Sequence, residues 1–429
     1  MKKVNEVALN NSNFTFSSNA KLLMETAREK QIPVLELDPE YDLFQLGYGK
    51  YSILFRGLVT EKSSGVFSSF KNEEVITSLL DSLEFRVDKN VKARKEKEYK
   101  ILVFNHQLIS ALEVGSKTKA DRLSELNNGS QELIKDLTQI YNLDLAEISV
   151  STNNIEASLE QQGQITAIDL NPDLSFYQEF VNLKKLSRKL INYYKPTKIP
   201  IVTVVGNNNE IIVRLLASIL EKVGLRTGVV VNNVIHNNQM NFKKRNNLNL
   251  LLQNKETEII VHGLTEQGLE EKELPYNISE LLLITDLESE ENLTFNNCLL
   301  GLNSNLIAVN VDKKSNLKLL QQSQEKEIIY CSLNSENIIL QQQINSQQPA
   351  VYTSKNNLVL FDGVDKLPVI SLDRLAAVTK EDPDIMSGIL FAVAAAFVFE
   401  IPVFVTRSIL ESLTTTGLAK YNKADLNIN

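Results

Sequence analysis

The sequence contains very few of the residues that build disulfide frameworks and histidine metal sites. Its 429 residues include two cysteines, Cys298 and Cys331, and three histidines, His106, His236 and His262. Two cysteines are too few for a disulfide framework or a cysteine metal cluster. The histidines lie in three separate segments, which disfavours a histidine-based metal site. We therefore interpret both cysteines as small buried residues in a reducing compartment.

Negative charge outnumbers positive charge. Lys and Arg total 45 against 53 Asp and Glu, and the formal net charge is −8. This balance does not predict nucleic acid or a membrane as a partner. Residues 1–6 lack the apolar stretch of a signal peptide, and the longest apolar run, 389–399, is too short to span a bilayer. We expect a cytoplasmic protein in which that run forms a buried helix.

The remaining composition is that of a globular protein, with 43% hydrophobic and 23% charged residues. The length suits two or three domains. We predict a flexible segment at 1–17, an α+β domain at 18–180, a linker helix at 181–197, a second domain at 198–418 and a tail at 419–429. The expected elements of the first domain are a helix at 22–28, strands at 33–37 and 52–60, a helix at 73–83, and a hairpin at 101–111 that turns at Asn105-His106-Gln107.

The pattern changes in the second domain, where apolar strands alternate with helices. The expected strands are 199–205, 228–231, 258–262, 281–285, 306–309 and 328–331, with helices at 213–223 and 316–322 between some of them. Such alternation predicts a parallel sheet covered by helices on both faces. We interpret the Gln-rich stretch 341–348 as a loop.

The turn after strand 199–205 has the outline of a phosphate-binding loop but lacks its chemistry. A working loop needs a second glycine, a lysine for phosphate charge and a hydroxyl for Mg²⁺. Here Gly206 is followed by Asn209, Glu210, Ile211 and Ile212 at those places. A lysine-to-glutamate change is large, because unit charges about 4 Å apart interact by about 4 kcal/mol at an effective dielectric near 20. A turn with a helix N-cap explains these residues better than a nucleotide site.

At this point the sequence resembles a known family. Residues 199–206, 215–220 and 224–228 are similar to the Mur-ligase half of cyanophycin synthetase, which has G-T-N-G-K-T-T at this turn. Gly206 and Asn208 match that motif, and the resemblance implies that they are the remnant of a nucleotide site. The implied fold of this half is a Mur-ligase central domain of the P-loop type.

The first domain resembles the ATP-grasp half of the same family. The similar stretches are 45–51 (QLGYGKY), 100–105 (KILVFN) and 143–148 (LDLAEI). Asp169-Leu170-Asn171 is similar to the family's metal-binding E-V-N, so the resemblance implies Asp169 and Asn171 as cation ligands. Between Phe85 and Lys92 the family inserts most of its nucleotide lid, for which this chain has no room. We therefore expect a reduced ATP-grasp-like domain.

Several family motifs have lost their reactive groups. The metal-binding E-T-A-R-G-G aligns with 263–268, which places Gly263 at the carboxylate and Glu266 at the arginine. The H-N-x-x-N stretch aligns with 384–388, and D-H-L-G aligns near 290–292. Asn310 and Asp312 match N-A-D, and they can equally cap a strand–helix turn. The family's N-terminal and C-terminal domains are expected to be missing.

These departures lead to three functional hypotheses. The first is a non-catalytic scaffold or regulatory subunit for an active cyanophycin synthetase or a related ATP-dependent peptide ligase, with no catalytic residue and no cofactor. The second is a divergent ATP-dependent acid–amino-acid ligase that uses ATP and Mg²⁺ at Asp169 and Asn171. The third is a small-molecule binding module. We expect a homo-oligomer or a complex with an active homologous ligase, and neither nucleic acid nor membrane as a partner.

Overall fold

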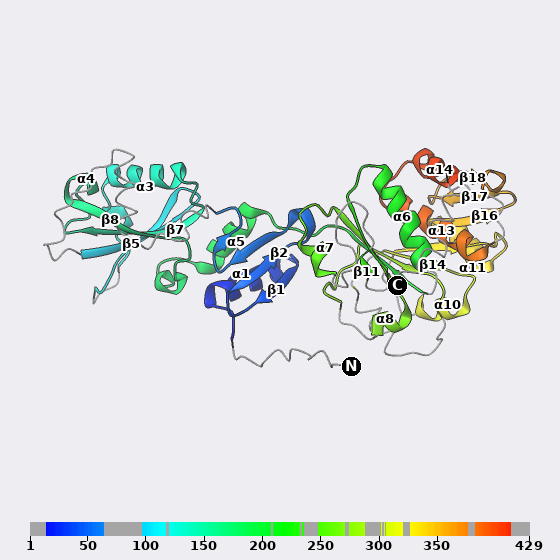
Figure 1. Ribbon diagram of the computed structural model, residues 1–429, viewed down its shortest axis with the longest axis horizontal. Helices are drawn as coiled ribbons and strands as arrows, with labels where there is room; N and C mark the ends of the chain where they lie inside the picture. Colours follow the sequence, from blue (N-terminus) through cyan, green and yellow to red (C-terminus); the bar gives the residue numbers. More distant parts are fainter. Residues whose placement is uncertain are drawn as a thin grey trace, which may run out of the picture. The chain divides into compact units, whose positions relative to one another are not determined.

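The chain forms two compact units, Met1–Thr197 and Lys198–Asn429, which we describe separately. The computed structural model in Figure 1 describes residues 14–63, 97–116, 120–206, 209–231, 234–235, 248–270, 274–287, 302, 304, 306–320, 327–375 and 382–412. The helix expected at 73–83 lies outside these residues, as do Cys298 and His236.

The first unit begins with a small antiparallel sheet. Its order is β1 (Val34–Asp38), β2 (Leu43–Leu46), β3 (Ile53–Arg56) and β4 (Val59–Thr60). Helices α1 (Ser18–Glu29) and α5 (Leu183–Tyr194) share a core with this sheet, in which Phe44 stacks on Phe55 at 5.2 Å. The strand expected at 52–60 is in fact two strands, because the chain turns at Gly57 with φ 60°.

Helix α5 has clear sequence boundaries. The side chain of Asn182 accepts a hydrogen bond from the Lys185 N–H, and the helix ends at Lys195 in a left-handed conformation. Leu186, Leu190 and Tyr194 recur every four residues and are buried. The segment expected as a linker helix is thus packed into the core of the first unit.

A second antiparallel sheet completes this unit. Its strands, in spatial order, are β6 (Gln107–Glu113), β5 (Lys97–Phe104), β7 (Leu145–Thr152) and β8 (Gly163–Asp169). Helices α3 (Asn128–Ile140) and α4 (Leu159–Gln162) share a hydrophobic core with the alternating residues Ile101, Val103, Ile148 and Val150. The short turns η1 (Gly49–Tyr51), η4 (Leu123–Glu125) and η5 (Leu174–Tyr177) connect the elements.

The described part of the second unit contains a ten-stranded sheet. Its spatial order is β11 (Val234–Ile235), β10 (Thr227–Val231), β12 (Ile259–Leu264), β9 (Ile201–Val205), β13 (Leu281–Ile284), β14 (Leu306–Asn310), β15 (Glu327–Ser332), β16 (Ala350–Ser354), β17 (Asn357–Phe361) and β18 (Lys366–Ser371). All six predicted strands are present and pair in parallel. The prediction of a parallel sheet is incomplete, because β11, β17 and β18 are antiparallel.

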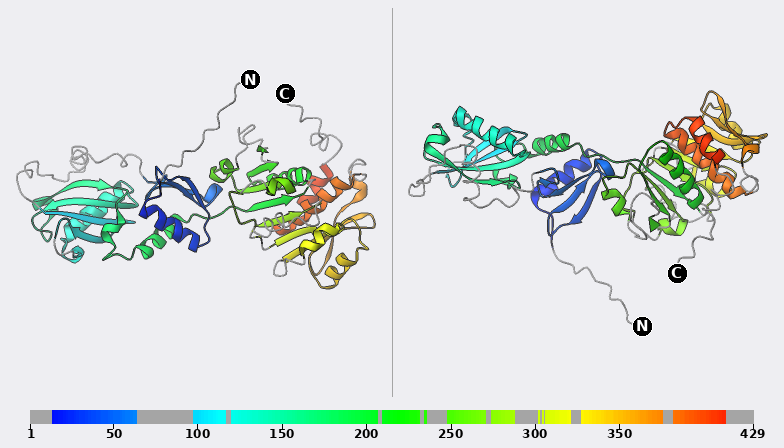
Figure 2. Two further views of the ribbon diagram at one scale, coloured as in Figure 1. Left: turned by 90° about the horizontal axis from the view of Figure 1, so that it is seen from below. Right: turned by 45° about the horizontal axis from the view of Figure 1, so that its top comes forward.

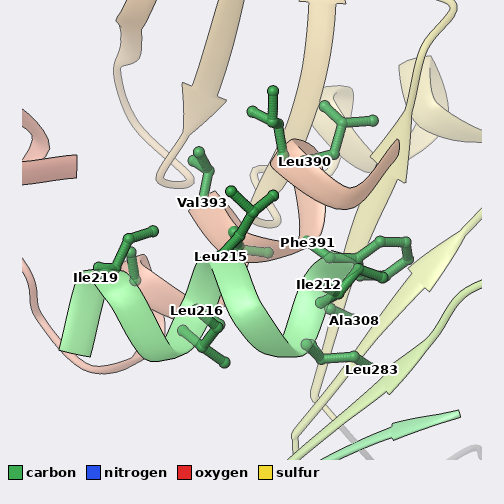
Figure 3. Close-up of a cluster of buried hydrophobic side chains, with 14 of the residues drawn as sticks. Ile212, Leu215, Leu216, Ile219, Leu283, Ala308, Leu390, Phe391 and Val393 are labelled. Atoms are coloured by element: carbon green, nitrogen blue, oxygen red, sulfur yellow. The ribbon is translucent and has the colours of Figure 1, made fainter. Parts of the chain in front are cut away.

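The helices of this unit are α6 (Asn209–Lys222), α7 (Asn249–Gln253), α8 (Glu266–Glu270), α10 (Lys314–Leu320), α11 (Ile338–Asn345), α13 (Pro383–Val398) and α14 (Val403–Ser412), with the turn η6 (Leu372–Arg374). Helices α6, α13 and α14 lie on one face of the sheet, and α8 and α10 lie on the other (Figures 1 and 2). In Figure 3, side chains of α6 and α13, including Ile212 and Phe391, gather with Leu283 and Ala308 of the sheet in one core.

Helix α13 contains the longest apolar run, and most of its residues are buried. A helix that is apolar on all sides is stable only when it is surrounded by other elements. The predicted buried helix is therefore confirmed. None of the described helices combines the length and hydropathy needed to cross a membrane. The loop expected at 341–348 is wrong for 341–345, which belong to α11.

Candidate functional site

The candidate site lies where the parallel strands of the second unit end. Strand β9 leads through α6 to β10 on one side, whereas β13 and β14 continue the sheet on the other. Such a switch in strand order is where open α/β sheets bind ligands, at the carboxyl ends of the strands. Gly206, Gly263, Thr285 and Asn310 lie at these strand ends.

Gly206, the first predicted nucleotide-binding residue, is held in place by packing. Its φ is 136°, and a Cβ there would lie 2.0 Å from Thr285 Oγ1 and 3.0 Å from the Asp286 nitrogen. Thr285 Oγ1 is itself fixed, because it donates to the Val205 carbonyl at 3.1 Å. The close approach of two strand ends therefore requires a glycine, whether or not phosphate binds. Asn208, the second predicted residue, lies outside the described residues.

Asn209 occupies the interior of the turn. Its side chain is buried, and its Nδ2 donates to the Gly206 carbonyl at 2.7 Å. Its Oδ1 finds no hydrogen-bond partner among the described residues. A Cβ at Gly263 would lie 2.8 Å from that Oδ1 and 2.9 Å from Val213 Cγ2. Asn209 thus fills the space that a side chain at position 263 would need.

The predicted alignment with cyanophycin synthetase places its differences in pairs of residues that touch in the structure. In that alignment Asn209 stands opposite a glycine and Gly263 opposite a carboxylate. Ile211 stands opposite a hydroxyl and Gly388 opposite an asparagine. A Cβ at Gly388 would lie 3.0 Å from Ile211 Cγ2, so these two residues are in close contact where α6 meets α13. The sequence revealed each change but not that the changed positions touch.

Glu210 would repel a phosphate group less strongly than the sequence suggested. Its Oε1 accepts hydrogen bonds from Arg214 Nε at 3.0 Å and Nη2 at 2.7 Å. This i,i+4 pair is partly exposed and compensates the carboxylate. A phosphate would meet a neutral pair in place of the family's lysine.

Asn310 and Asp312 join the turn after β14 to its neighbours at the same strand ends. Asn310 Nδ2 donates to Asp286 Oδ1 at 3.1 Å, and its Oδ1 accepts from the Asp312 N–H at 3.0 Å. The Asp312 carboxylate accepts from Ser332 Oγ at 2.6 Å and from the Leu333 N–H at 2.7 Å. These bonds tie the ends of β14 and β15 together.

The predicted cation ligands of the first unit are both bound to backbone. Asp169 Oδ1 accepts from the Asn171 N–H at 2.8 Å, and Asn171 Oδ1 accepts from the Leu58 N–H at 2.8 Å. A Cβ at Gly57 would lie 2.4 Å from Asn171 Oδ1, so the carboxamide closes the turn between β3 and β4. Within the described ranges, no group of three or more His, Cys, Asp or Glu residues is placed to hold a metal ion.

A charged cluster beside Asp169 was missed in the sequence. Lys100 Nζ lies 2.7 Å from Glu147 Oε1, and Tyr177 Oη donates to Glu147 Oε2 at 2.7 Å. Glu147 is buried and faces Asp169 across the β7–β8 pair. Burial, followed by the nearby Glu147 carboxylate, raises the pKa of Tyr177 above its usual range. The available signal was Glu147, which stands between the apolar residues Ala146 and Ile148 of β7.

A row of hydrogen-bonded polar side chains lies on the face of the larger sheet opposite to α6 and α13. His262 Nδ1 lies 2.9 Å from Tyr276 Oη, which lies 3.0 Å from Thr203 Oγ1, which in turn lies 2.9 Å from Ser279 Oγ. Burial lowers the pKa of His262 to about 3, so the ring is neutral at pH 7. Its Nε2 has no hydrogen-bond partner among the described residues.

Comparisons with known proteins give structural similarities but no sequence match. No family model matches the chain, and no curated protein is similar to it in sequence. The solved structure of UDP-N-acetylmuramoyl-L-alanyl-D-glutamate–2,6-diaminopimelate ligase, a Mur ligase, matches 53% of this chain with 13% identity and a TM-score of 0.39. The match covers 49% of that ligase, so the chain spans about half its length. The resemblance to cyanophycin synthetase and to ATP-grasp domains stays a prediction.

Proposed function

We propose that this chain is a non-catalytic protein that keeps a ligase-like framework and works as a scaffold or regulatory subunit. Its partner would be an active ATP-dependent peptide ligase of the cyanophycin synthetase type. The packing of Asn209 against Gly263 is the observation that carries the proposal. A side chain of the protein itself fills the position where the family motif supplies a phosphate-binding glycine.

The other positions of the site support the same proposal. Phosphoryl transfer depends on a backbone cradle, a cation and bound Mg²⁺ acting together. Here Glu210 is paired with Arg214, and Ile211 packs against Gly388. Each replacement serves helix stability or packing, which favours selection for the fold over selection for turnover.

The ligase hypothesis for the first unit draws on Asp169 and Asn171. An Mg²⁺ ion takes oxygen ligands that are free to approach it. The only side-chain oxygen of Asn171 accepts a bond from Leu58, and one oxygen of Asp169 accepts from Asn171. These contacts argue against that hypothesis, and ATP binding measured with and without Mg²⁺ tests it directly.

We expect the purified chain to bind ATP more weakly than about 1 mM, because Asn209 fills the turn after β9 and Glu210 stands where a lysine would meet phosphate. Titration calorimetry with ATP, in the presence and absence of Mg²⁺, measures this. We also expect no ATP-dependent addition of aspartate or arginine to a cyanophycin-like primer. An active cyanophycin synthetase in parallel provides the positive control. Steady polymer growth from the clean chain would contradict the proposal.

We expect the variant Glu210→Lys to remain without ATPase activity. The substitution restores the charge but leaves Asn209 buried in the turn and Ile211 without a hydroxyl. When catalytic groups act together, restoring one of them does not restore activity. A phosphate-release assay compares the variant with the wild type, and Glu336→Gln, a distant surface change, controls for preparation. Turnover above wild type would show that the loop is better preserved than we propose.

We expect the chain to associate with itself or with a ligase at micromolar concentration. The residues of the apolar run 401–405 differ in exposure. Ile401 is buried, whereas the side chain of Phe404 in α14 is 69% exposed. An exposed aromatic ring is a common anchor at interfaces. Light scattering gives the mass, and Phe404→Glu should shift it toward the monomer. A strictly monomeric mass, with no ligase recovered on the tagged chain, would oppose the scaffold role.

A further inference from the structure

A large cavity lies at the amino-terminal ends of the parallel strands in the ten-stranded sheet. Its volume is about 850 Å³, within the range of small-molecule sites. Pro200, Leu306, Ile328 and Pro349 line it from the starts of β9, β14, β15 and β16. The end of α13 supplies Phe397, Val398 and Phe399, which are half-buried. The floor is therefore apolar, and it shares no residue with the site at the strand ends.

The charged residues of this cavity are mostly acidic. Lys198, Glu280, Glu327 and Glu400 line it. Lys198 Nζ lies 2.9 Å from Glu280 Oε2, so the one lysine is compensated. Among the described residues, Glu327 and Glu400 form no ion pair, and two carboxylates remain uncompensated.

The end of helix α13 adds to this negative potential. A helix C-terminus carries a partial negative charge, equivalent to roughly half an elementary charge, and a basic side chain in the last turn often offsets it. Helix α13 has 16 residues and no basic residue in its last turn. Its final residues Phe397 and Val398 line the cavity. The rings of Phe397 and Phe399 can in addition face a cation.

We propose that this cavity binds an organic cation with an apolar body, such as a primary amine on an aromatic or aliphatic group. The apolar floor takes the body, and Glu327, Glu400 and the end of α13 take the ammonium group. An anionic ligand of the same size is disfavoured by the same charges. This site does not depend on the proposed function, because it lies at the opposite edge of the sheet from Asn209 and Gly263.

Three probes of one size test the charge preference: 4-phenylbutylamine, 4-phenyl-1-butanol and 4-phenylbutanoate. Calorimetry or ligand-observed NMR on the full chain should rank amine above alcohol above carboxylate. Two surface charges and a helix end each contribute modestly, so we expect the amine to bind about tenfold tighter than the alcohol at low salt. The difference should shrink at high salt.

Substitutions locate the site. The double variant Glu327→Gln, Glu400→Gln should lose the preference for the amine while the alcohol binds as before. Glu336→Gln, an exposed glutamate outside the cavity, should leave all three affinities unchanged. Val398→Trp places a bulkier side chain on the apolar floor and should weaken both amine and alcohol binding. The charge variants decide the question even if that larger change disturbs folding.

A neighbouring cavity of about 250 Å³ shares Phe397 and Glu400 and is also lined by Thr406. Thr406→Val should not alter amine binding if the probe occupies the larger cavity. The proposal is overturned if the carboxylate binds as well as the amine, if the double variant keeps the preference, or if Thr406→Val weakens the amine. It is equally overturned if no probe binds at about 10 mM, the limit of a very weak site.

Discussion

Replacing Gly206 with alanine should destabilise the second unit by roughly 3 kcal/mol or more. The new Cβ would lie 2.0 Å from Thr285 Oγ1 and 3.2 Å from the Asp286 carbonyl oxygen, at a φ of 136°. The backbone conformation and the overlap both oppose the side chain, and the ends of β9 and β13 would have to separate. Urea unfolding gives the loss of stability. Hydrogen exchange of peptides from β9 and β13 locates it, with peptides of the first unit as the internal reference.

Gly224→Ala separates the two causes. Gly224 follows α6 in the same unit with φ 88°, and a Cβ there would meet nothing within 4 Å. This control should therefore lose only the conformational part, about 1–2 kcal/mol. The double variant Gly206→Ala, Thr285→Ala should be less unstable than the sum of its single changes, since the closest contact is gone. Equal losses in the two glycine variants would mean that Thr285 does not hold Gly206.

The outcome bears on how the turn is interpreted. A glycine after the first strand of an α/β sheet is usually taken as a sign of phosphate binding. In this chain the contact with Thr285 is sufficient reason for the glycine. The match of Gly206 to the family motif therefore carries no weight for nucleotide binding.

Much of the second unit could be predicted from sequence because its parallel strands are buried on both faces. Apolar runs such as 281–284, and 201–205 with its single threonine, mark such strands plainly. The hairpin β16–β17 was missed because its turn, Lys355-Asn356, has no glycine, although Lys355 adopts a φ of 52°. The hairpin expected at 101–111 was found because asparagine favours a left-handed conformation. Asn105 and His106 have positive φ, whereas Gln107, also expected in the turn, begins β6.

Composition was misleading in helix α11. The run around Gln341 was interpreted as a loop because it is polar and repetitive. Glutamine is nevertheless a good helix former. Asn337 caps the helix through the Ile339 and Leu340 N–H groups, and Leu340 and Ile344 are buried one turn apart. The cap and the apolar spacing were the better signals.

The candidate site could be only partly predicted because it is formed by contacts between segments that are far apart in the sequence. The sequence shows that positions 209, 211, 263 and 388 differ from the motifs of the family it was predicted to resemble. That these positions fit one another in pairs depends on the meeting of α6, β12 and α13. The cluster around Glu147 was missed for the same reason, since Lys100 and Tyr177 reach it from other elements.

Acid should destabilise the second unit through His262. Burial lowers its folded pKa to about 3, against 6.5 for the free side chain. Below pH 6.5 the unfolded chain binds a proton that the folded chain does not, so stability falls as the pH falls from 6.5 toward 3. Each pH unit costs about 1.4 kcal/mol, which gives roughly 2 kcal/mol by about pH 5. Carboxylates also titrate in this range, so the test is a difference between variants.

His262→Gln removes the titrating group but keeps a polar side chain for Tyr276. Its stability should fall less steeply between pH 7 and about pH 5, by about the 2 kcal/mol assigned to the ring. Tyr276→Phe is the matched control. It removes the hydroxyl 2.9 Å from Nδ1 and should lower stability at every pH, yet it should keep the wild-type slope, because burial is the cause of the shift. Urea unfolding at each pH, with hydrogen exchange of β9 and β12 peptides corrected for intrinsic rates, measures all three proteins. If His262→Gln keeps the wild-type slope, the ring is protonated without unfolding, and the polar chain must open to water.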